Sequence, residues 1–349
     1  MKTINFKMKW ALSAALFVLL LNVVSMNNAL AQNQVATLQH NDTITGVFYG
    51  SDAFTLAYSA AVDGDVITLS SGFFSGIDIG KSITIHGAGP VYDSLTGLTP
   101  TIITGNKRLI VDNISFEGVL FTGLIAPGWS NSQTHLANNI NFLKCNINCI
   151  GTTTWYAGTH LNWQFVDCII KNFHTSDAYY PSMSIINSVV RFNKYNHNSE
   201  SKPTNIHNSV VVFDSIVNIK NIVAFNSIIA TSSGHDVSNC TFYNCIGIKT
   251  GETSLFEGQI ANNTMEVDGY DDVFKTFAGT VSYEEDYKLN ENIATTFLGS
   301  DGKEVGIYGG LMPYKARPGY MIIKNCNVAS QTDANKKLSV EIELLNDGE

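Results

Sequence analysis

The feature that most constrains this chain is a four-residue phrase that recurs through its middle. Each copy begins with a polar residue suited to a corner, continues with a small residue and ends with two mostly β-branched residues. The clear copies are Asp167-Cys168-Ile169-Ile170, Asn187-Ser188-Val189-Val190, Asn208-Ser209-Val210-Val211, Asn226-Ser227-Ile228-Ile229 and Asn244-Cys245-Ile246-Gly247. Their starts lie 20, 21, 18 and 18 residues apart. A repeat of about 20 residues with this composition predicts a solenoid of stacked coils, and the Leu-rich consensus of leucine-rich repeats is missing.

The repeat predicts columns of equivalent residues along the solenoid axis. Strands of successive coils pair about 4.8 Å apart, so each position of the phrase stacks on its own copies. The first column is Asp followed by four Asn. Asn tolerates the left-handed backbone that a sharp corner needs, and stacked amides can hydrogen-bond from coil to coil. We therefore expect an Asn ladder at one corner, followed by a column of small Cys and Ser residues inside the bend.

Two further columns are expected to fill the core, and a third raises a question. The core columns are the last position of the phrase and the residue two before the corner, which is Phe165 in the first clear copy and Ile185 in the second. The third position should point outward in a strand, yet it is apolar in Ile169, Val189 and Val210. Two explanations remain open. Either a loop covers this face, or the alternation of inward and outward residues shifts here.

Three further stretches lie before and after the clear repeats. The sequence opens its repeats with DGDVITLSSGFF at 63–74 and IDIGKSITIHGAG at 77–89, and it closes with GSDGKEVGIYGG at 299–310. With the phrases above, they make the chain from about Asp65 to Gly247 resemble the right-handed parallel β-helix superfamily, which has the pectate-lyase-like fold. The closing segment resembles that of secreted members from the Bacteroidetes group. The resemblance implies an all-β, right-handed parallel β-helix solenoid. It implies no activity, because the Arg-Pro-containing catalytic segment and the clustered calcium aspartates of pectate lyases have no counterpart here.

The chain divides into four expected segments. They are a signal peptide at 1–31, an N-terminal strand and capping helix at 32–64, the parallel β-helix at 65–262, and a C-terminal cap or β segment at 263–349. Open strand edges at the ends of a solenoid need to be covered, which is the role expected of the helix. The helix is predicted from about Ala53 to Val62 with Asp52 as its N-cap, and residues 32–42 are expected to be a loose polar segment.

The N-terminus has the pattern of a targeting signal. Three lysines precede a largely apolar run at 11–24, and Ala29-Leu30-Ala31 is a small-x-small cleavage site. An apolar run of 14 residues is short for a bilayer crossing. We therefore expect a cleaved signal peptide, no transmembrane anchor, and a protein that is secreted or held at the cell surface or in the periplasm.

The charge limits which ligands the protein is expected to bind, and the cysteine content bears on zinc binding and disulfides. The formal net charge is −9, and removal of the three N-terminal lysines leaves 18 basic and 30 acidic residues, a net charge of −12. This balance argues against a nucleic-acid partner, although a local basic patch could still bind a polyanion. The six cysteines match no zinc spacing. Three of them share the small inward column with serines, so buried free thiols are favoured over disulfides.

The catalytic candidates lie near the strand ends. Lys171 and Arg191 share a column in adjacent coils. In polysaccharide lyases of this fold, cationic residues neutralise a uronate carboxylate and a Lys or Arg serves as base, so the resemblance implies such a role for this pair. His174 and Asp177 lie close in one loop and are candidates for a general base. The alternative is that the two cations are ordinary solvated surface residues.

Aromatic residues on the expected loops are the binding candidates. Tryptophan and tyrosine rings offer flat apolar faces to sugar rings while their polar edges stay in water. The residues are Trp129, Trp155, Tyr156, Tyr179, Tyr180 and Tyr195. The alternative is that these aromatic residues cover the apolar outer column instead.

Together these features predict an exported β-helix protein that binds or processes a polysaccharide along its loop-lined side. The alternative is a non-catalytic surface adhesin or a structural protein. If the protein is an enzyme, it is expected to be a polysaccharide lyase or glycoside hydrolase. The cofactor is not specified: Asp268, Asp271 and Asp272 have enough charge for calcium, but no EF-hand spacing is present. The sequence predicts no oligomeric state.

Overall fold

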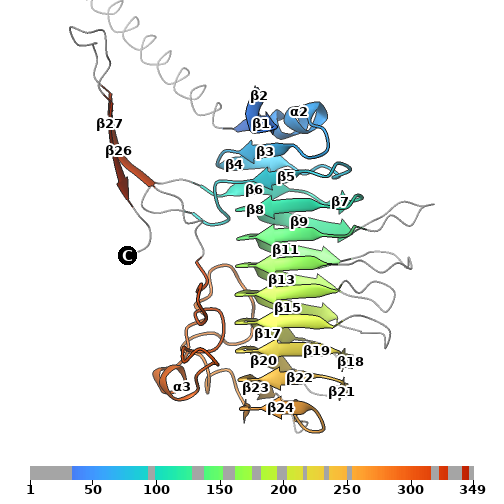
Figure 1. The fold of residues 1–349 in the computed structure, drawn as a ribbon, viewed down its shortest axis with the longest axis vertical. Helices are drawn as coiled ribbons and strands as arrows, with labels where there is room; N and C mark the ends of the chain where they lie inside the picture. The colour runs from blue at the N-terminus through green and yellow to red at the C-terminus, as the bar shows by residue number, and fades with distance from the viewer. Residues whose placement is uncertain are drawn as a thin grey trace, which may run out of the picture.

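Two long sheets built from stacked coils form the body of the molecule, a parallel β-solenoid (Figure 1). The computed structural model describes residues 34–92, 99–127, 137–151, 162–174, 182–194, 203–214, 218–231, 236–249, 254–315, 322–328 and 340–345. Each coil contributes one strand to the first sheet, turns a corner at the four-residue phrase, and contributes the next strand to the second sheet. The predicted solenoid is confirmed.

The first sheet, called sheet A, has 12 strands. In spatial order they are β2 (Thr43–Tyr49), β1 (Val35–His40), β3 (Val66–Leu69), β5 (Thr84–His86), β8 (Ile114–Glu117), β10 (Ile140–Leu143), β12 (Trp163–Val166), β14 (Met183–Ile186), β16 (Thr204–His207), β19 (Ile222–Phe225), β22 (Thr241–Tyr243) and β24 (Ile260–Asn262). All neighbours from β3 onward pair in parallel.

The second sheet, called sheet B, has 11 strands and is also parallel. In spatial order they are β25 (Met265–Val267), β23 (Ile246–Lys249), β20 (Ile228–Thr231), β17 (Val210–Phe213), β15 (Val189–Lys194), β13 (Ile169–His174), β11 (Asn146–Gly151), β9 (Leu120–Pro127), β6 (Thr101–Thr104) and β4 (Gly72–Ser75), with β7 (Lys107–Leu109) paired to β9. Two small pairs complete the strands, β18 (Asn218–Lys220) with β21 (Asp236–Ser238), and the hairpin β26 (Ile322–Val328) with β27 (Val340–Leu345).

The corners between the sheets follow the expected left-handed backbone. The phrase-starting residues Asp167, Asn187, Asn208, Asn226 and Asn244 have φ between 46° and 53°. Asn263 Nδ2 donates to Asn244 Oδ1 at 2.7 Å, as an Asn ladder requires. A second ladder, not predicted, lies at the corner before sheet A and joins Asn113, Asn139 and Asn162 through amide hydrogen bonds of 2.9 and 3.0 Å.

The small inward column does more than fit inside the bend. The backbone N–H of Cys168 donates to Ser188 Oγ at 2.9 Å, and the N–H of Ser188 donates to Ser209 Oγ at 3.1 Å. Each hydroxyl therefore satisfies a buried N–H of the preceding coil. The five cysteines among the described residues for which side chains are placed are free thiols, as expected.

The core is filled by stacked columns, as predicted. Phe116, Phe142 and Phe165 stack with ring centroids 5.3 Å apart and nearly parallel rings. Their neighbours in the last position of the phrase, such as Ile170 and Val190, are fully buried. Parallel pairing keeps identical side chains in register, so each coil buries its apolar face against the next.

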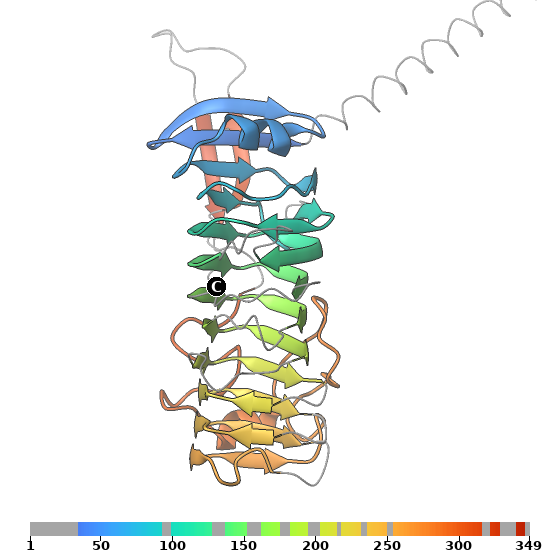
Figure 2. The ribbon, with the colours of Figure 1, turned by 90° about the vertical axis from the view of Figure 1, so that its right-hand side faces the viewer.

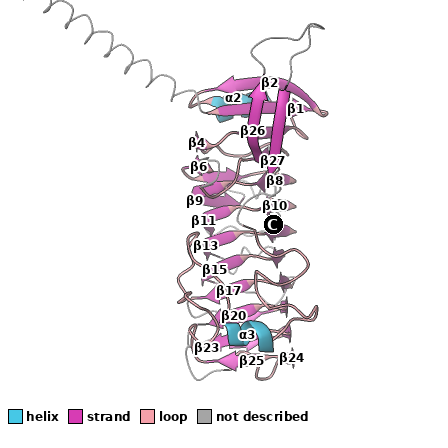
Figure 3. Cartoon of the chain, turned by 90° about the vertical axis from the view of Figure 1, so that its left-hand side faces the viewer, coloured by secondary structure: helices cyan, strands magenta, loops and turns pink. Residues whose placement is uncertain are grey.

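The apolar outer column of sheet B is covered by the C-terminal segment, residues 268–315. Ile169, Val189 and Val210 are at most 2% exposed and pack with residues of this segment, including Phe274 and Tyr287. The segment contains α3 (Glu291–Thr296) and runs beside the lower half of the stack in Figures 1 and 3. The first explanation for the apolar outward column is therefore correct, because a covering segment buries this face.

The N-terminal end differs in part from expectation. The antiparallel hairpin β1–β2 and α2 (Ala53–Ala60) lie there, shown in blue in Figure 2. Residues 35–40 are a strand and not a loose segment, because Ala36 and Leu38 are buried where β1 pairs with β3. Asp52 precedes α2, but its side chain makes no capping hydrogen bond.

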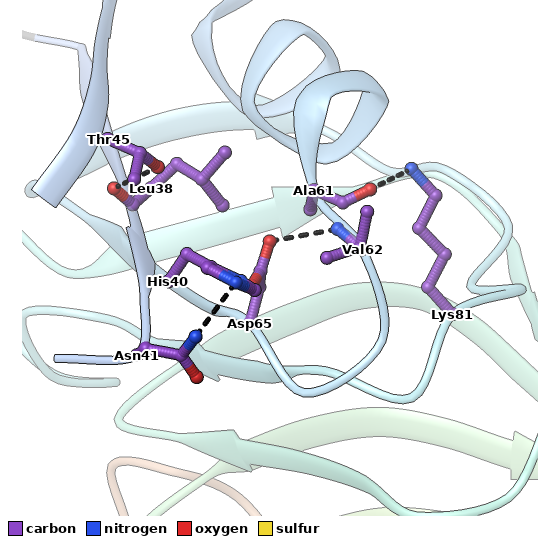
Figure 4. Close-up of polar contacts among 8 residues, drawn as sticks. All are labelled: Leu38, His40, Asn41, Thr45, Ala61, Val62, Asp65 and Lys81. Atoms are coloured by element: carbon purple, nitrogen blue, oxygen red, sulfur yellow. Dashed lines mark hydrogen bonds and ion pairs between the residues drawn. The ribbon is translucent and has the colours of Figure 1, made fainter. Parts of the chain in front are cut away.

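A polar cluster joins this end to the first coil (Figure 4). His40 Nδ1 lies 2.6 Å from Asp65 Oδ1, and the N–H of Val62 donates to the other Asp65 oxygen at 2.8 Å. Lys81 Nζ donates to the Ala61 carbonyl at 2.6 Å. Burial alone would raise the pKa of Asp65, but the hydrogen bonds from Val62 and His40 bring it below its usual value. The ionised carboxylate therefore helps to hold the hairpin, α2 and the first coil together.

Candidate functional site

The outer surface of sheet A from β5 to β22, called face A, consists of two side-chain columns. The first column carries uncharged side chains, all of them at least partly exposed and all but one polar. Its members are Thr84, Ser115, Asn141, Gln164, Ser184, Asn205, Val223 and Thr241. Asn141 Nδ2 donates to Ser115 Oγ of the adjacent coil at 3.2 Å. The column thus presents a line of amide and hydroxyl groups along the solenoid axis.

The second column of face A is mostly apolar. Its members are His86, Glu117, Leu143, Val166, Ile186, His207, Phe225 and Tyr243. All eight are partly exposed. The last three rings stack, with centroid distances of 5.0 Å from His207 to Phe225 and from Phe225 to Tyr243. Burial lowers the pKa of His207, so its imidazole is neutral at pH 7. Polar and apolar columns therefore run side by side.

The local sequence explains why these side chains share one face. Strand residues alternate between the two sides of a sheet, so the residues on either side of the buried core position both point outward. In β19 the buried Ala224 lies between Val223 and Phe225, and in β22 the buried Phe242 lies between Thr241 and Tyr243. The second column is the residue immediately before each corner. This pattern is visible in the sequence, but the binding residues predicted from the sequence lie on the loops and not in these columns.

The C-terminal segment borders face A at the corner. Asn187, which follows Ile186 of the apolar column, donates from Nδ2 to the carbonyl of Met312. Leu311 and Met312 are 88% and 75% exposed, the highest values among the large hydrophobic residues described. This hydrogen bond therefore fixes the backbone of Met312 at the corner that follows the apolar column.

The two predicted catalytic cations lie on the outer side of sheet B, and each has its own partner. Lys171 Nζ lies 4.2 Å from the centre of the Tyr283 ring, a cation–π contact with the C-terminal segment. Arg191 forms an ion pair with Asp214. The repulsion expected between two stacked cations is thus relieved by different groups, and no shared anion is needed. Their catalytic role stays a prediction.

The remaining sequence candidates are only partly placed. His174 ends β13, where it pairs in register with Gly151 and Lys194. A Cβ atom on Gly151 would lie 2.9 Å from His174 Cβ, so the glycine makes room for the histidine. The other candidates lie outside the described residues. They are Asp177, Trp129, Trp155, Tyr156, Tyr179, Tyr180 and Tyr195.

Other places for chemistry are few in the described part of the chain. It contains no group of three or more His, Cys, Asp or Glu side chains placed to hold a metal. Asp268, one of the calcium candidates, lies 3.5 Å from Lys249 Nζ. A shallow pocket of about 280 Å³ is lined by Tyr270, Phe274 and Lys275, and Lys275 lies 3.6 Å from Glu291. The pocket lining also includes Asp271 and Thr276, and the Thr276 hydroxyl donates to the Asp286 carbonyl at 3.3 Å.

The fold and these columns define a class of protein, a parallel β-solenoid with one long face on which a polar column and a mostly apolar column run side by side. Comparison with protein-family models, curated proteins and solved structures finds no match to this chain. None of the helices among the described residues combines the length and apolar character needed to cross a membrane. Because a solenoid fold supports many activities, the function has to be argued from the side chains themselves.

Proposed function

We propose that this is an exported protein that binds a polysaccharide along face A. The observation that carries the proposal is the pair of parallel columns, one of amides and hydroxyls and one of apolar and aromatic side chains. A glycan also has both apolar and polar surfaces, because its ring faces carry C–H groups and its edges carry hydroxyl groups. A chain lying along the solenoid axis would meet both columns over many coils.

The chemistry of face A supports binding more than catalysis. Glycoside hydrolysis needs two carboxyl groups at a set separation, and the two columns contain one, Glu117. Its Oε2 lies 2.9 Å from His86 Nδ1 at the N-terminal end of the apolar column. Lyase or hydrolase activity is the alternative, with Lys171, Arg191, His174 and Asp177 as the proposed catalytic residues.

Export and fold type belong to the same proposal. Residues 1–31 have the three-part pattern of a signal peptide, and the intact mass of the exported protein tests cleavage after Ala31. We also propose a right-handed, pectate-lyase-like coil with α2 as its N-terminal cap. The opening and closing segments resemble that superfamily, and parallel crossover connections are almost always right-handed.

Binding is tested by comparing several polysaccharides as ligands of the full exported chain. Affinity electrophoresis in gels that contain each glycan should show retardation by at least one of them. Phe225→Ala combined with Tyr243→Ala should weaken that binding by about tenfold, the effect of losing about 1.4 kcal/mol of contact. Phe73→Ala is the matched control, because Phe73 is an aromatic residue 60% exposed on β4 of sheet B.

The same samples distinguish a binder from an enzyme. Ultraviolet absorbance from unsaturated uronates would show a lyase, and new reducing ends without that absorbance would show a hydrolase. The absorbance and the reducing ends are both measured with and without calcium. Retardation without either product supports the proposal. Product formation that is unchanged by the Phe225→Ala and Tyr243→Ala variants would move the site away from face A.

A further inference from the structure

We infer that the ligand of face A is a neutral polysaccharide and not a polyanionic one. This inference rests on the proposed function and adds the chemical class of the glycan. It follows from the charges on face A, from the partners of the cations elsewhere and from the hydrogen-bonding capacity of the polar column.

Face A itself has no cation to offer an anionic sugar. Neither column contains a lysine or arginine. Besides the phenol of Tyr243, the titratable side chains of the two columns are the imidazoles of His86 and His207 and the carboxyl group of Glu117. His86 is already bound to Glu117 at 2.9 Å, and the lowered pKa of His207 leaves it neutral at pH 7. A uronate would therefore meet one carboxylate and no free positive charge.

Most cations described elsewhere on the molecule have a partner. The pairs are Lys81 with the Ala61 carbonyl, Arg108 with Asp78, Lys171 with the Tyr283 ring, Arg191 with Asp214, Lys249 with Asp268, Lys275 with Glu291, Lys288 with Asp286 and Lys303 with the Gly310 carbonyl. Lys107 is buried inside the coil. The other cations with described side chains are Lys144, whose charge favours the ionised form of Asp167, Lys220 on β18, and Lys315. None of them belongs to either column.

A neutral glycan suits what face A does offer. Amide and hydroxyl groups both donate and accept hydrogen bonds, as sugar hydroxyls do, so Asn141, Gln164 and Asn205 can pair with a hydroxyl in either direction. The apolar column supplies contact for C–H groups without charge. A polyanion would instead need cations to replace its counterions, and the whole chain carries a net charge of −9 that repels it.

The experiment measures dissociation constants of the full exported chain for neutral glycans (a β-glucan, a xylan and a mannan) and for anionic glycans (polygalacturonate and alginate). Each is measured at about 50 and about 500 mM NaCl, because salt screens binding that depends on charge. We expect binding to at least one neutral glycan that changes less than about twofold with salt, and no binding to the anionic glycans.

Two engineered cations test whether the binding site lies on face A. Gln164→Lys and Ser184→Lys together put positive charge on the polar column and should create salt-sensitive binding to polygalacturonate. Thr122→Lys, at an exposed position of β9 in sheet B, is the matched control and should not. Circular dichroism checks that each variant remains folded. Failure of the folded double variant to gain polygalacturonate binding would contradict the location of the site on face A.

The outcomes separate the inference from the proposed function. Salt-sensitive binding of the wild type to anionic glycans alone would overturn the inference and leave polysaccharide binding standing, with cations outside the described residues as its source. Absence of binding to every glycan would overturn both. Neutral-glycan binding that survives Phe225→Ala with Tyr243→Ala would overturn the assignment to face A.

Discussion

Asp167 occupies a corner where the next four coils have asparagine. It is almost fully buried, and its Oδ1 atom has no hydrogen-bond partner among the described residues. Burial raises its pKa to about 6, and this effect exceeds the opposing influence of Lys144 and Asn187. A carboxyl group that binds its proton more tightly in the folded chain than in the unfolded chain destabilises the fold once it ionises.

Asp167→Asn should therefore stabilise the protein at neutral pH. The free energy of unfolding of the wild type should fall as pH rises from about 4 to about 6, since the unfolded carboxyl ionises first, and the variant should lose this dependence. The expected gain at pH 7 is about 1–3 kcal/mol, and it should vanish below about pH 4. Urea unfolding at several pH values measures it, with the exposed Asp236→Asn as control. A gain of equal size at all pH values would show that ionisation is not the cause.

Lys107 is the opposite case, a buried base. It is 2% exposed, its Nζ lies 4.8 Å from the centre of the Phe121 ring, and burial lowers its pKa to about 7. The folded chain therefore binds fewer protons than the unfolded chain between about pH 7 and pH 10.5. Stability should rise with pH across this window, and the cost of burying the amine is fully present below it.

Lys107→Met should relieve that cost. Methionine keeps the unbranched shape and packs well against an aromatic ring. We expect a gain of about 2–4 kcal/mol in the free energy of unfolding at pH 6 and a much smaller gain near pH 10. Chemical unfolding at both pH values measures the difference, and the exposed Lys315→Met should change neither. Lys107 Nζ also donates to the Ile103 carbonyl at 3.4 Å. A variant less stable than the wild type at pH 6 would mean that this hydrogen bond and the contact with the Phe121 ring outweigh the desolvation of Lys107.

At the scale of elements, the C-terminal segment is held to sheet B by close contact at the corners. Gly306 has a φ of 85°, and a Cβ atom there would lie 3.1 Å from Ile228 Cδ1. Its N–H donates to the Asn226 carbonyl at 2.8 Å, and Asn226 Oδ1 accepts a hydrogen bond of 2.9 Å from the Ser300 N–H. The glycine-rich closing sequence therefore packs its backbone against the corner, and asparagines that could have extended the ladder bind this segment instead.

Neighbouring residues of β20 provide a test of this packing. Ile228 faces the C-terminal segment and Ile229 faces the solenoid core, and both are fully buried. Each change to alanine should cost about 2–4 kcal/mol by creating a cavity. Ile228→Ala should also accelerate proteolytic cleavage within residues 268–315 while the strand signal in circular dichroism remains. If Ile229→Ala accelerates that cleavage as much, the segment does not depend on the contact at Ile228.

At the scale of the whole molecule, the sequence predicts best what repeats. The period placed the corners, the stacked core and the parallel pairing, because each of these depends on residues at equivalent positions of adjacent coils. The contact between Lys171 and Tyr283 joins residues more than a hundred positions apart that share no repeat, so it could not be predicted from the sequence. The apolar outer column left a covering loop and a shift of the alternation both open, and it did not indicate which segment supplies the cover. Face A could not be identified as a binding face from the sequence, because small polar strand residues are also common on ordinary solvent-exposed sheets.

The stacking of the coils also determines how far the destabilising effect of a core substitution should extend through the molecule. A solenoid is stabilised mainly by contacts between neighbouring coils, so a defect should weaken the coils beside it more than distant ones. Phe142 lies in the middle of the aromatic stack, with Phe116 and Phe165 at 5.3 Å on either side. Phe242 lies near the C-terminal end, and its ring packs against Phe256 at 5.0 Å.

Phe142→Ala should therefore cost about 3–5 kcal/mol and increase hydrogen exchange in β8, β10 and β12. Phe242→Ala should cost less and affect mainly β19, β22 and β24, since fewer coils lie beyond it. Hydrogen exchange followed by mass spectrometry, peptide by peptide, compares the two variants directly. Loss of protection spread evenly over both sheets in either variant would mean that the coils unfold as one cooperative unit. Face A would then be lost or kept as a whole, and a glycan bound at one end would stabilise the coils at the other.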